Sequence, residues 1–161
     1  VLPKYVKKKE SILEIGCNIG RNLNALFEEG YLNLTGIDIN TKAIKKSKEV
    51  YPNLKAELIN NSIENWVKGK EKYDCIYTMA VMVHLPYESD WVFKKIAKKA
   101  RRTLITIEDE ENVTWKHFPR NYNNIFSKFG WREVFFEELD GPDALKGYKT
   151  RVFKRKFFGL F

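Results

Sequence analysis

Residues 11–26 read SILEIGCNIGRNLNAL, and their pattern gives the strongest indication of the fold class. An apolar run ends at Gly16, a short loop reaches Gly20, and a helical pattern begins at Arg21. The two glycines let the backbone turn tightly and approach a bound molecule, and Asn18 between them tolerates a positive φ. The free N–H groups of the helix that follows point toward the same place. The stretch therefore predicts a strand, a ligand-binding loop and a helix, with a nucleotide-like ligand.

The rest of the chain repeats this alternation. We expect strands over residues 11–16, 33–39, 55–60, 73–80, 102–107, 132–138 and 148–156, and helices over 21–29, 41–50, 63–68, 88–99 and 121–129. Only a short connection separates the last two strands, and parallel neighbours need a long crossover, so that pair is antiparallel. The pattern predicts a Rossmann-like α/β fold. Its seven-stranded sheet is mostly parallel, with one antiparallel strand near an edge and helices on both faces.

Composition narrows the class of protein. A length of 161 residues fits one domain over residues 1–161, and no apolar run reaches the ~20 residues of a membrane span. Two cysteines without a CxxC pattern predict no disulfide framework and no metal site, in a reducing cytoplasmic setting. The net charge of +8 comes mostly from scattered lysines. A nucleic-acid partner is therefore allowed but not favoured.

A second anchor for the ligand follows the first. Asp38 lies 22 residues after Gly16, at the end of the second strand in LTGIDIN. A carboxylate at this place can accept hydrogen bonds from both hydroxyl groups of a ribose. Its alternative role is to cap the next helix, for which Thr41 is also a candidate. NAD fits less well, because Asn18 and Arg21 stand where the G-x-G-x-x-G fingerprint needs glycine.

Four segments together resemble class I S-adenosylmethionine-dependent methyltransferases. LEIGCNIG is similar to the family's first motif, GIDIN to its second, ELINNSIENW to its third and YDCIYTMAVMVHLP to its fourth. The resemblance covers residues 11–156 and departs from the first motif at Asn18. It implies that the protein moves the methyl group of S-adenosylmethionine to a small-molecule acceptor by direct displacement, leaving S-adenosylhomocysteine.

The resemblance also implies the cofactor-binding residues. The methionine part would contact the loop from Gly16 to Gly20, with Glu14 near the amino group and Arg21 near a carboxylate. Asp38 would bind the ribose and Ile39 would pack on the adenine. The set is Glu14, Gly16, Cys17, Asn18, Gly20, Arg21, Asp38, Ile39, Asn61, Ser62, Ile63 and Met79. Arg21 could instead pair with Glu28 or Glu29, and the Cys17 thiol is interpreted as a packing group.

The acceptor side depends on the loops after the fourth and fifth strands. His84 could accept a proton near neutral pH, or could pack against the helix that follows it. Glu108 and Asp109 are expected to line the acceptor site, and Glu110 and Glu111 to be solvated. An aromatic and basic loop could bind a planar or anionic acceptor, or could be a surface connection. Its residues are Trp115, His117, Arg120 and Tyr122.

Other functions remain open at the level of sequence. A methyltransferase of RNA or protein predicts lysine and arginine gathered around the pocket mouth, with salt-sensitive binding. A non-catalytic module with this fold predicts that S-adenosylmethionine does not bind. The apolar end FFGLF would pack back on the sheet or form a homodimer contact.

Overall fold

One mixed sheet of seven strands forms the middle layer of the protein, in the order β3-β2-β1-β4-β5-β7-β6. The structure is a computed structural model that describes residues 1–140 and 145–155. Its strands are β1 Ile12–Ile15, β2 Leu34–Asp38, β3 Glu57–Asn60, β4 Tyr73–Met79, β5 Ala100–Glu108, β6 Trp131–Glu138 and β7 Lys149–Arg155. Its helices are α1 Leu2–Tyr5, α2 Arg21–Glu28, α3 Thr41–Val50, α4 Ile63–Trp66, α5 Trp91–Lys99 and α6 Tyr122–Ser127. Two 3₁₀ turns span Met82–His84 and Tyr87–Ser89.

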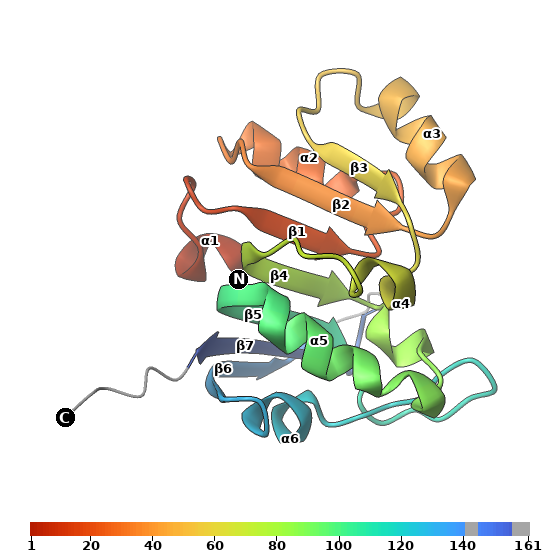
Figure 1. The fold of residues 1–161 in the computed structure, drawn as a ribbon, viewed down its shortest axis with the longest axis vertical. Helices are drawn as coiled ribbons and strands as arrows, with labels where there is room; N and C mark the ends of the chain where they lie inside the picture. Colours follow the sequence, from red (N-terminus) through yellow and green to blue (C-terminus); the bar gives the residue numbers. More distant parts are fainter. Residues whose placement is uncertain (141–144, 156–161) are drawn as a thin grey trace.

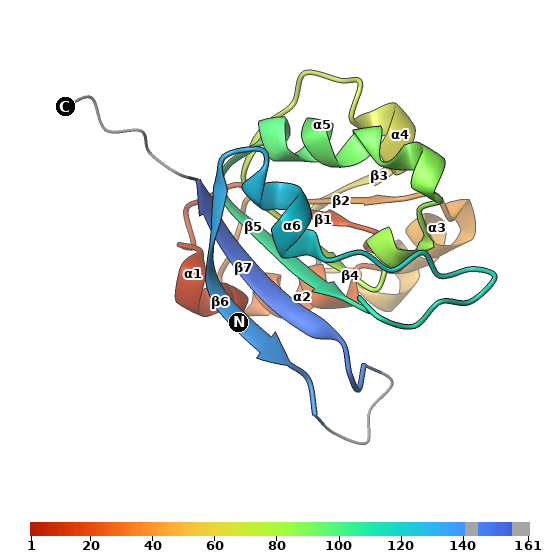
Figure 2. The same cartoon turned by 90° about the horizontal axis from the view of Figure 1, so that it is seen from below.

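The predicted topology is confirmed. The first five strands run parallel, and β7 lies antiparallel to both of its neighbours, β5 and β6. Helices α1, α2 and α3 cover one face of the sheet and α4, α5 and α6 cover the other (Figures 1 and 2). Each face has its own apolar core, so the protein is a three-layer α/β structure.

The strand order reverses between β1 and β4. From β1 the chain adds β2 and β3 in one direction, whereas β4 and β5 extend the sheet in the other. In the middle of the sheet, Ile12 of β1 lies opposite Leu34 of β2 on one side and opposite Cys75 of β4 on the other. In open α/β sheets a crevice forms beyond the carboxyl ends of the strands at such a point. This edge lies on the right in Figure 1, where the parallel strands end.

Several predicted boundaries were wrong. Residues 88–99 do not form one helix, because a 3₁₀ turn ends at Ser89 and α5 starts at Trp91. Trp91, the first residue of α5, is 44% exposed, while Val92 and Phe93 face the core. The short helix α1 had no predicted counterpart, and β5 begins at Ala100. Helix ends fray, so a pattern of apolar residues places them less well than it places the middle of a helix.

Two expectations concern the end of the chain. The apolar segment 157–161, with its expected sheet or homodimer contact, lies outside the described residues. In the described part, no helix has both the length and the apolar character needed to cross a bilayer. The same residues contain no group of three histidine, cysteine or acidic side chains that could hold a metal ion.

Candidate cofactor and acceptor site

A cavity of about 790 Å³ opens at the carboxyl ends of β1, β2 and β4. It is lined by Glu14, Gly16, Cys17, Asn18, Ile19, Arg21, Asn22, Ile37, Asp38, Ile39, Asn61, Ser62, Ile63, Glu64, Met79, Ala80, Val81, His84, Leu85, Pro86 and Leu145. The structure thus brings together every predicted cofactor-binding residue except Gly20, together with His84. Ligand pockets of ~300–1,000 Å³ hold small molecules and cofactors, so the cavity has a suitable size.

The loop after β1 has the backbone that its glycines predicted. Gly16, Asn18 and Gly20 all have positive φ, at 74°, 51° and 80°. A Cβ at Gly16 would lie 2.2 Å from Val81 Cγ2, so the absence of a side chain there lets the loop after β4 close on the first loop. Gly20 does not line the cavity. It is the N-cap of α2, and a Cβ there would press on Leu54.

Asp38 joins this loop to the end of β2. Its Oδ2 accepts a hydrogen bond from the Asn18 backbone N–H at 2.7 Å, and its Oδ1 accepts one from the Asn40 N–H at 2.7 Å. A carboxylate has about four acceptor positions, so each oxygen keeps one for a ligand. The helix cap is Asn40, whose side chain accepts from Lys42 and Ala43. The prediction of Thr41 as the cap was wrong, because Thr41 already lies inside the first turn.

The β2 and β3 ends form the far side of the cavity. Ile39 lines it with 74% of its surface exposed, which is unusual for a large aliphatic side chain. Asn61 donates its backbone N–H to the Asp38 carbonyl at 3.1 Å, and Ser62 caps α4. Asn60, which the sequence analysis missed, donates to the Asp38 and Ile39 carbonyls at 2.9 and 3.0 Å. These bonds hold the ligand-facing turn in place.

Glu14 is the buried acid of the site. Only 2% of its surface is exposed, and its Oε1 accepts a hydrogen bond from Asn22 Nδ2 at 2.7 Å. Its Oε2 and the hydroxyl of Tyr77, which is opposite Glu14 on β4, are both buried, and the Tyr77 hydroxyl lies close enough to lower the pKa of Glu14 by hydrogen bonding. Burial raises the pKa of Glu14 to about 7, against the lowering effect of the Asn22 hydrogen bond. A buried carboxylate in the wall of the cavity is suited to an ammonium group.

The neighbouring Cys17 and Arg21 differ in character. Cys17 is buried, and burial raises the pKa of its thiol to about 12, so its position before a helix does not activate it. Its sulfur occupies the space left by the missing side chain of Gly36. Arg21 lines the cavity. The expected partner Glu28 accepts a hydrogen bond from Asn24 instead, at 2.9 Å.

His84 lies on the opposite rim, in the loop after β4. Its Nδ1 is 3.1 Å from the Lys116 carbonyl oxygen. A carbonyl only accepts hydrogen bonds, so in the neutral ring Nδ1 carries the proton and Nε2 keeps a lone pair. The ring meets His117 edge to face, with centroids 4.9 Å apart. The exposed imidazole thus lies against the loop 109–121 rather than against α5.

Several residues expected at the acceptor site are elsewhere. Glu108 and Asp109 are buried and do not line the cavity. Asp109 accepts hydrogen bonds from Glu111 and Asn112 in its own turn. Glu110 is not solvated, because its carboxylate accepts two hydrogen bonds from Arg151 at 2.8 Å.

The aromatic and basic loop after β5 is mostly structural. Arg120 is buried and pairs with Asp90 at 2.7 Å, over the ring of Tyr87. Tyr122 is a core residue, and Trp115 is 82% exposed. Of the four loop residues that were predicted to bind the acceptor, His117 reaches the rim of the cavity, where its ring contacts His84.

The sequence also gave no signal for part of the lining. Ala80 and Val81 follow β4 and line the cavity, and Ala80 has a φ of 55°, which is uncommon for a residue other than glycine. Asn22, on the first turn of α2, reaches back to Glu14. These positions depend on how distant strands meet, so no local pattern marks them.

Comparison with known proteins identifies the family. A protein-family model described as "Methyltransferase domain" matches residues 12–104. Among solved structures, the N-methyltransferase NodS from Bradyrhizobium japonicum WM9, in complex with S-adenosylhomocysteine, superposes with a TM-score of 0.77 at 20% identity, covering 91% of this chain and 79% of that chain. Magnesium protoporphyrin IX methyltransferase from Synechocystis PCC 6803, with bound S-adenosylmethionine, gives 0.74 at 16%, covering 92% and 71%. At these identities the likeness shows a shared fold.

A curated relative matches only locally. The eEF1A lysine and N-terminal methyltransferase of Mus musculus is 43% identical over 49 residues, which are 30% of this chain and 7% of that protein. The matched segment is thus a small part of that relative's length. With the family model, the sheet order and the cavity together, the chain belongs to the class I S-adenosylmethionine-dependent methyltransferases.

Proposed function

We propose that this protein binds S-adenosylmethionine in the 790 Å³ cavity and transfers its methyl group to a small-molecule acceptor. The observation that carries the proposal is the meeting of three features at one sheet edge. These are the positive-φ loop after β1, the Asp38 carboxylate and the buried Glu14 carboxylate. The neighbours crystallised with S-adenosylmethionine and S-adenosylhomocysteine share this fold and support the choice of cofactor.

Each residue then has a role in holding the cofactor. The loop from Gly16 to Arg21 faces the methionine part, Glu14 faces its ammonium group, and Asp38 accepts from the ribose hydroxyls. Ile39 packs on the adenine, and this contact would cover the exposed surface of the Ile39 side chain. Asn61, Ser62, Ile63 and Met79 complete the adenine and sulfonium sides, and Gly20 supports the loop from behind.

The bound sulfonium supplies an already activated methyl group. The protein's task is to align an acceptor atom with it and to exclude water, and alignment of this kind contributes ~7–11 kcal/mol to catalysis. Where the acceptor must lose a proton, Nε2 of His84 is the proton acceptor, because its lone pair is free at the cavity rim. A proton–nitrogen NMR spectrum that places the neutral imidazole's proton on Nε2 would remove His84 from this role.

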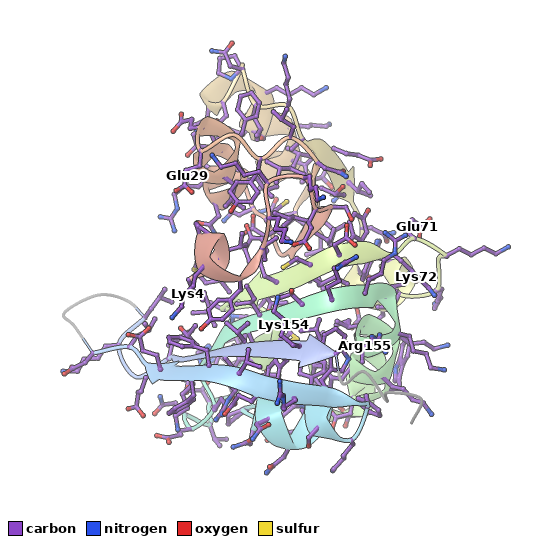
Figure 3. All side chains as sticks on the ribbon, turned by 90° about the vertical axis from the view of Figure 1, so that its left-hand side faces the viewer. Lys4, Glu29, Glu71, Lys72, Lys154 and Arg155 are labelled. Atoms are coloured by element: carbon purple, nitrogen blue, oxygen red, sulfur yellow. The ribbon has the colours of Figure 1, made fainter. Side chains whose placement is uncertain are left out.

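The distribution of charge favours a small acceptor over RNA. Of the lysines and arginines that the structure describes, Arg21 alone lines the cavity. Figure 3 views the edge opposite the cavity, where Lys4, Lys72, Lys154 and Arg155 lie. Lys154 and Arg155 donate to backbone carbonyls there, so part of the positive charge serves the fold. A protein acceptor stays the second candidate, because of the 49-residue similarity to a lysine and N-terminal methyltransferase.

Titration calorimetry with three ligands tests the proposal. S-adenosylmethionine and S-adenosylhomocysteine are expected to bind, and NAD is expected not to. Binding of NAD alone would indicate an oxidoreductase. Binding of none of the three would indicate a non-catalytic module that kept the fold.

Cofactor binding is also expected to depend on pH through Glu14. The pKa of its carboxyl is about 7 in the empty site, and a ligand ammonium beside it favours the ionised form. Binding therefore releases a proton below this pKa, and affinity for S-adenosylhomocysteine falls as the pH falls through 7. Calorimetry in phosphate and in Tris measures the released proton, since the two buffers differ in ionisation heat.

The Glu14→Gln variant is the control for this linkage. It retains a side chain of the same shape, and it should bind more weakly at pH 8 with no buffer-dependent heat near neutrality. A native protein whose binding heat is the same in both buffers would contradict the placement of the ammonium at Glu14.

We also propose that the protein is located in the cytoplasm. Its support is that Cys17 and Cys75 are both buried free thiols, which suits a reducing compartment.

A further inference from the structure

Glu108 is a buried carboxylate that binds a neighbouring loop rather than a ligand. It ends β5, is fully buried, and lies beside the loop that follows β4. Its Oε1 accepts hydrogen bonds from the backbone N–H groups of Val81 and Met82 at 3.2 and 3.1 Å. Its Oε2 accepts from Val81 and Val83 at 3.0 and 3.2 Å. Three consecutive backbone donors thus converge on one side chain.

These donors belong to the segment that shapes the cavity. Val81 presses against the loop at Gly16, and His84 lies on the rim of the cavity. The same segment is held from its other side, because the Phe118 N–H donates to the Val83 carbonyl at 2.7 Å. His84 donates in turn to the Lys116 carbonyl. The short turn Met82–His84 therefore lies between two anchors, the Glu108 side chain and the loop 109–121.

An amide side chain could not satisfy this arrangement. Both oxygens of a carboxylate accept, whereas a glutamine offers one oxygen and an N–H₂ group that would face a backbone donor. Burial raises the pKa of Glu108 to about 7, so the protein keeps the group here at a cost.

We propose that Glu108 is a positioning residue that holds the turn Met82–His84, so that His84 keeps its hydrogen bond to Lys116 and presents Nε2 to the acceptor. The inference rests on the proposed function for the role of His84. Its contacts, however, are properties of the free protein and are measurable without an acceptor.

The test uses NMR of the whole chain, which has only two histidines. In the native protein, the neutral His84 ring should carry its proton on Nδ1, and His117→Gln identifies which signals belong to His84. In Glu108→Gln the His84 proton should move largely to Nε2, and amide exchange at Met82 and Val83 should speed up by about ten-fold or more. The matched control is Glu111→Gln on the following loop, which removes an exposed ion pair with Lys149 and should leave both readouts unchanged.

Two further measurements keep the test decisive. Glu108→Asp keeps the charge but withdraws it by one methylene, so it should loosen the same amides less than glutamine does. If both variants fail to fold, a pH titration of the native protein followed by NMR provides the test. The amide chemical shifts of residues 81–83 should change as the Glu108 carboxyl ionises. Amide shifts that stay constant through this ionisation would overturn the inference.

The failure of the inference differs from the failure of the proposed function. Folded Glu108→Gln with an unchanged His84 tautomer and unchanged amide exchange would refute the positioning role. A native protein that does not bind S-adenosylhomocysteine would refute the proposed function instead, whatever the NMR shows.

Discussion

Replacing Asp38 by alanine is expected to weaken S-adenosylhomocysteine binding by about ten-fold or more, because hydrogen bonds to a charged group contribute ~1.5–3 kcal/mol. Asp38 ends β2 at the cavity and already holds the first loop through the Asn18 N–H. The substitution removes a ribose partner and a loop contact together. Calorimetry or equilibrium dialysis measures the change in affinity.

Comparing two ligands distinguishes the loss of the ribose contact from the loss of the loop contact. Native protein should prefer adenosine to 2′,3′-dideoxyadenosine, and Asp38→Ala should lose that preference, because only the ribose contact distinguishes the two ligands. Glu49→Ala, an exposed acid on α3, is the control and should bind as the native protein does. A variant at Asp38 that keeps the preference would place the ribose elsewhere.

Gly16→Ala is expected to reduce both folding stability and cofactor binding. The residue has a φ of 74°, where a side chain costs ~1–2 kcal/mol. Its Cβ would also lie 2.2 Å from Val81 Cγ2, and overpacking costs a further ~1–3 kcal/mol. Val81 has little freedom to retreat, because Glu108 holds its N–H. Denaturant unfolding and calorimetry measure the two losses.

Gly130→Ala is the matched control for this substitution. Gly130 has a φ of 81°, but a Cβ there meets nothing within 4 Å, so only the backbone strain remains. The double variant Gly16→Ala with Val81→Ala removes the clash and should recover stability relative to Gly16→Ala alone. Equal losses at Gly16 and Gly130, without rescue, would show that Val81 does not close on the first loop.

Sequence reasoning worked best where the structure depends on neighbouring residues. The positive φ at Gly16, Asn18 and Gly20 follows from local turn chemistry, and the placement of Asp38 follows from the end of one apolar run. It failed at polar residues whose partners come from other segments. Glu108, Glu110 and Arg120 were assigned to the acceptor site or to solvent, whereas each is held by a group 27 or more residues away in the chain: Val81, Arg151 and Asp90.

The alternation of strands and helices, the glycine loop and the acid at the second strand could all be predicted from the sequence, because apolar periodicity and backbone freedom are local properties. Which polar groups face the cavity depends instead on how the strands and loops pack together. A buried carboxylate turns toward whichever donors the packing brings to it, and for Glu108 these are the backbone N–H groups of the β4 loop. The register of β4 against β5 places Glu108 beside the loop after β4, and this register cannot be predicted from either strand alone.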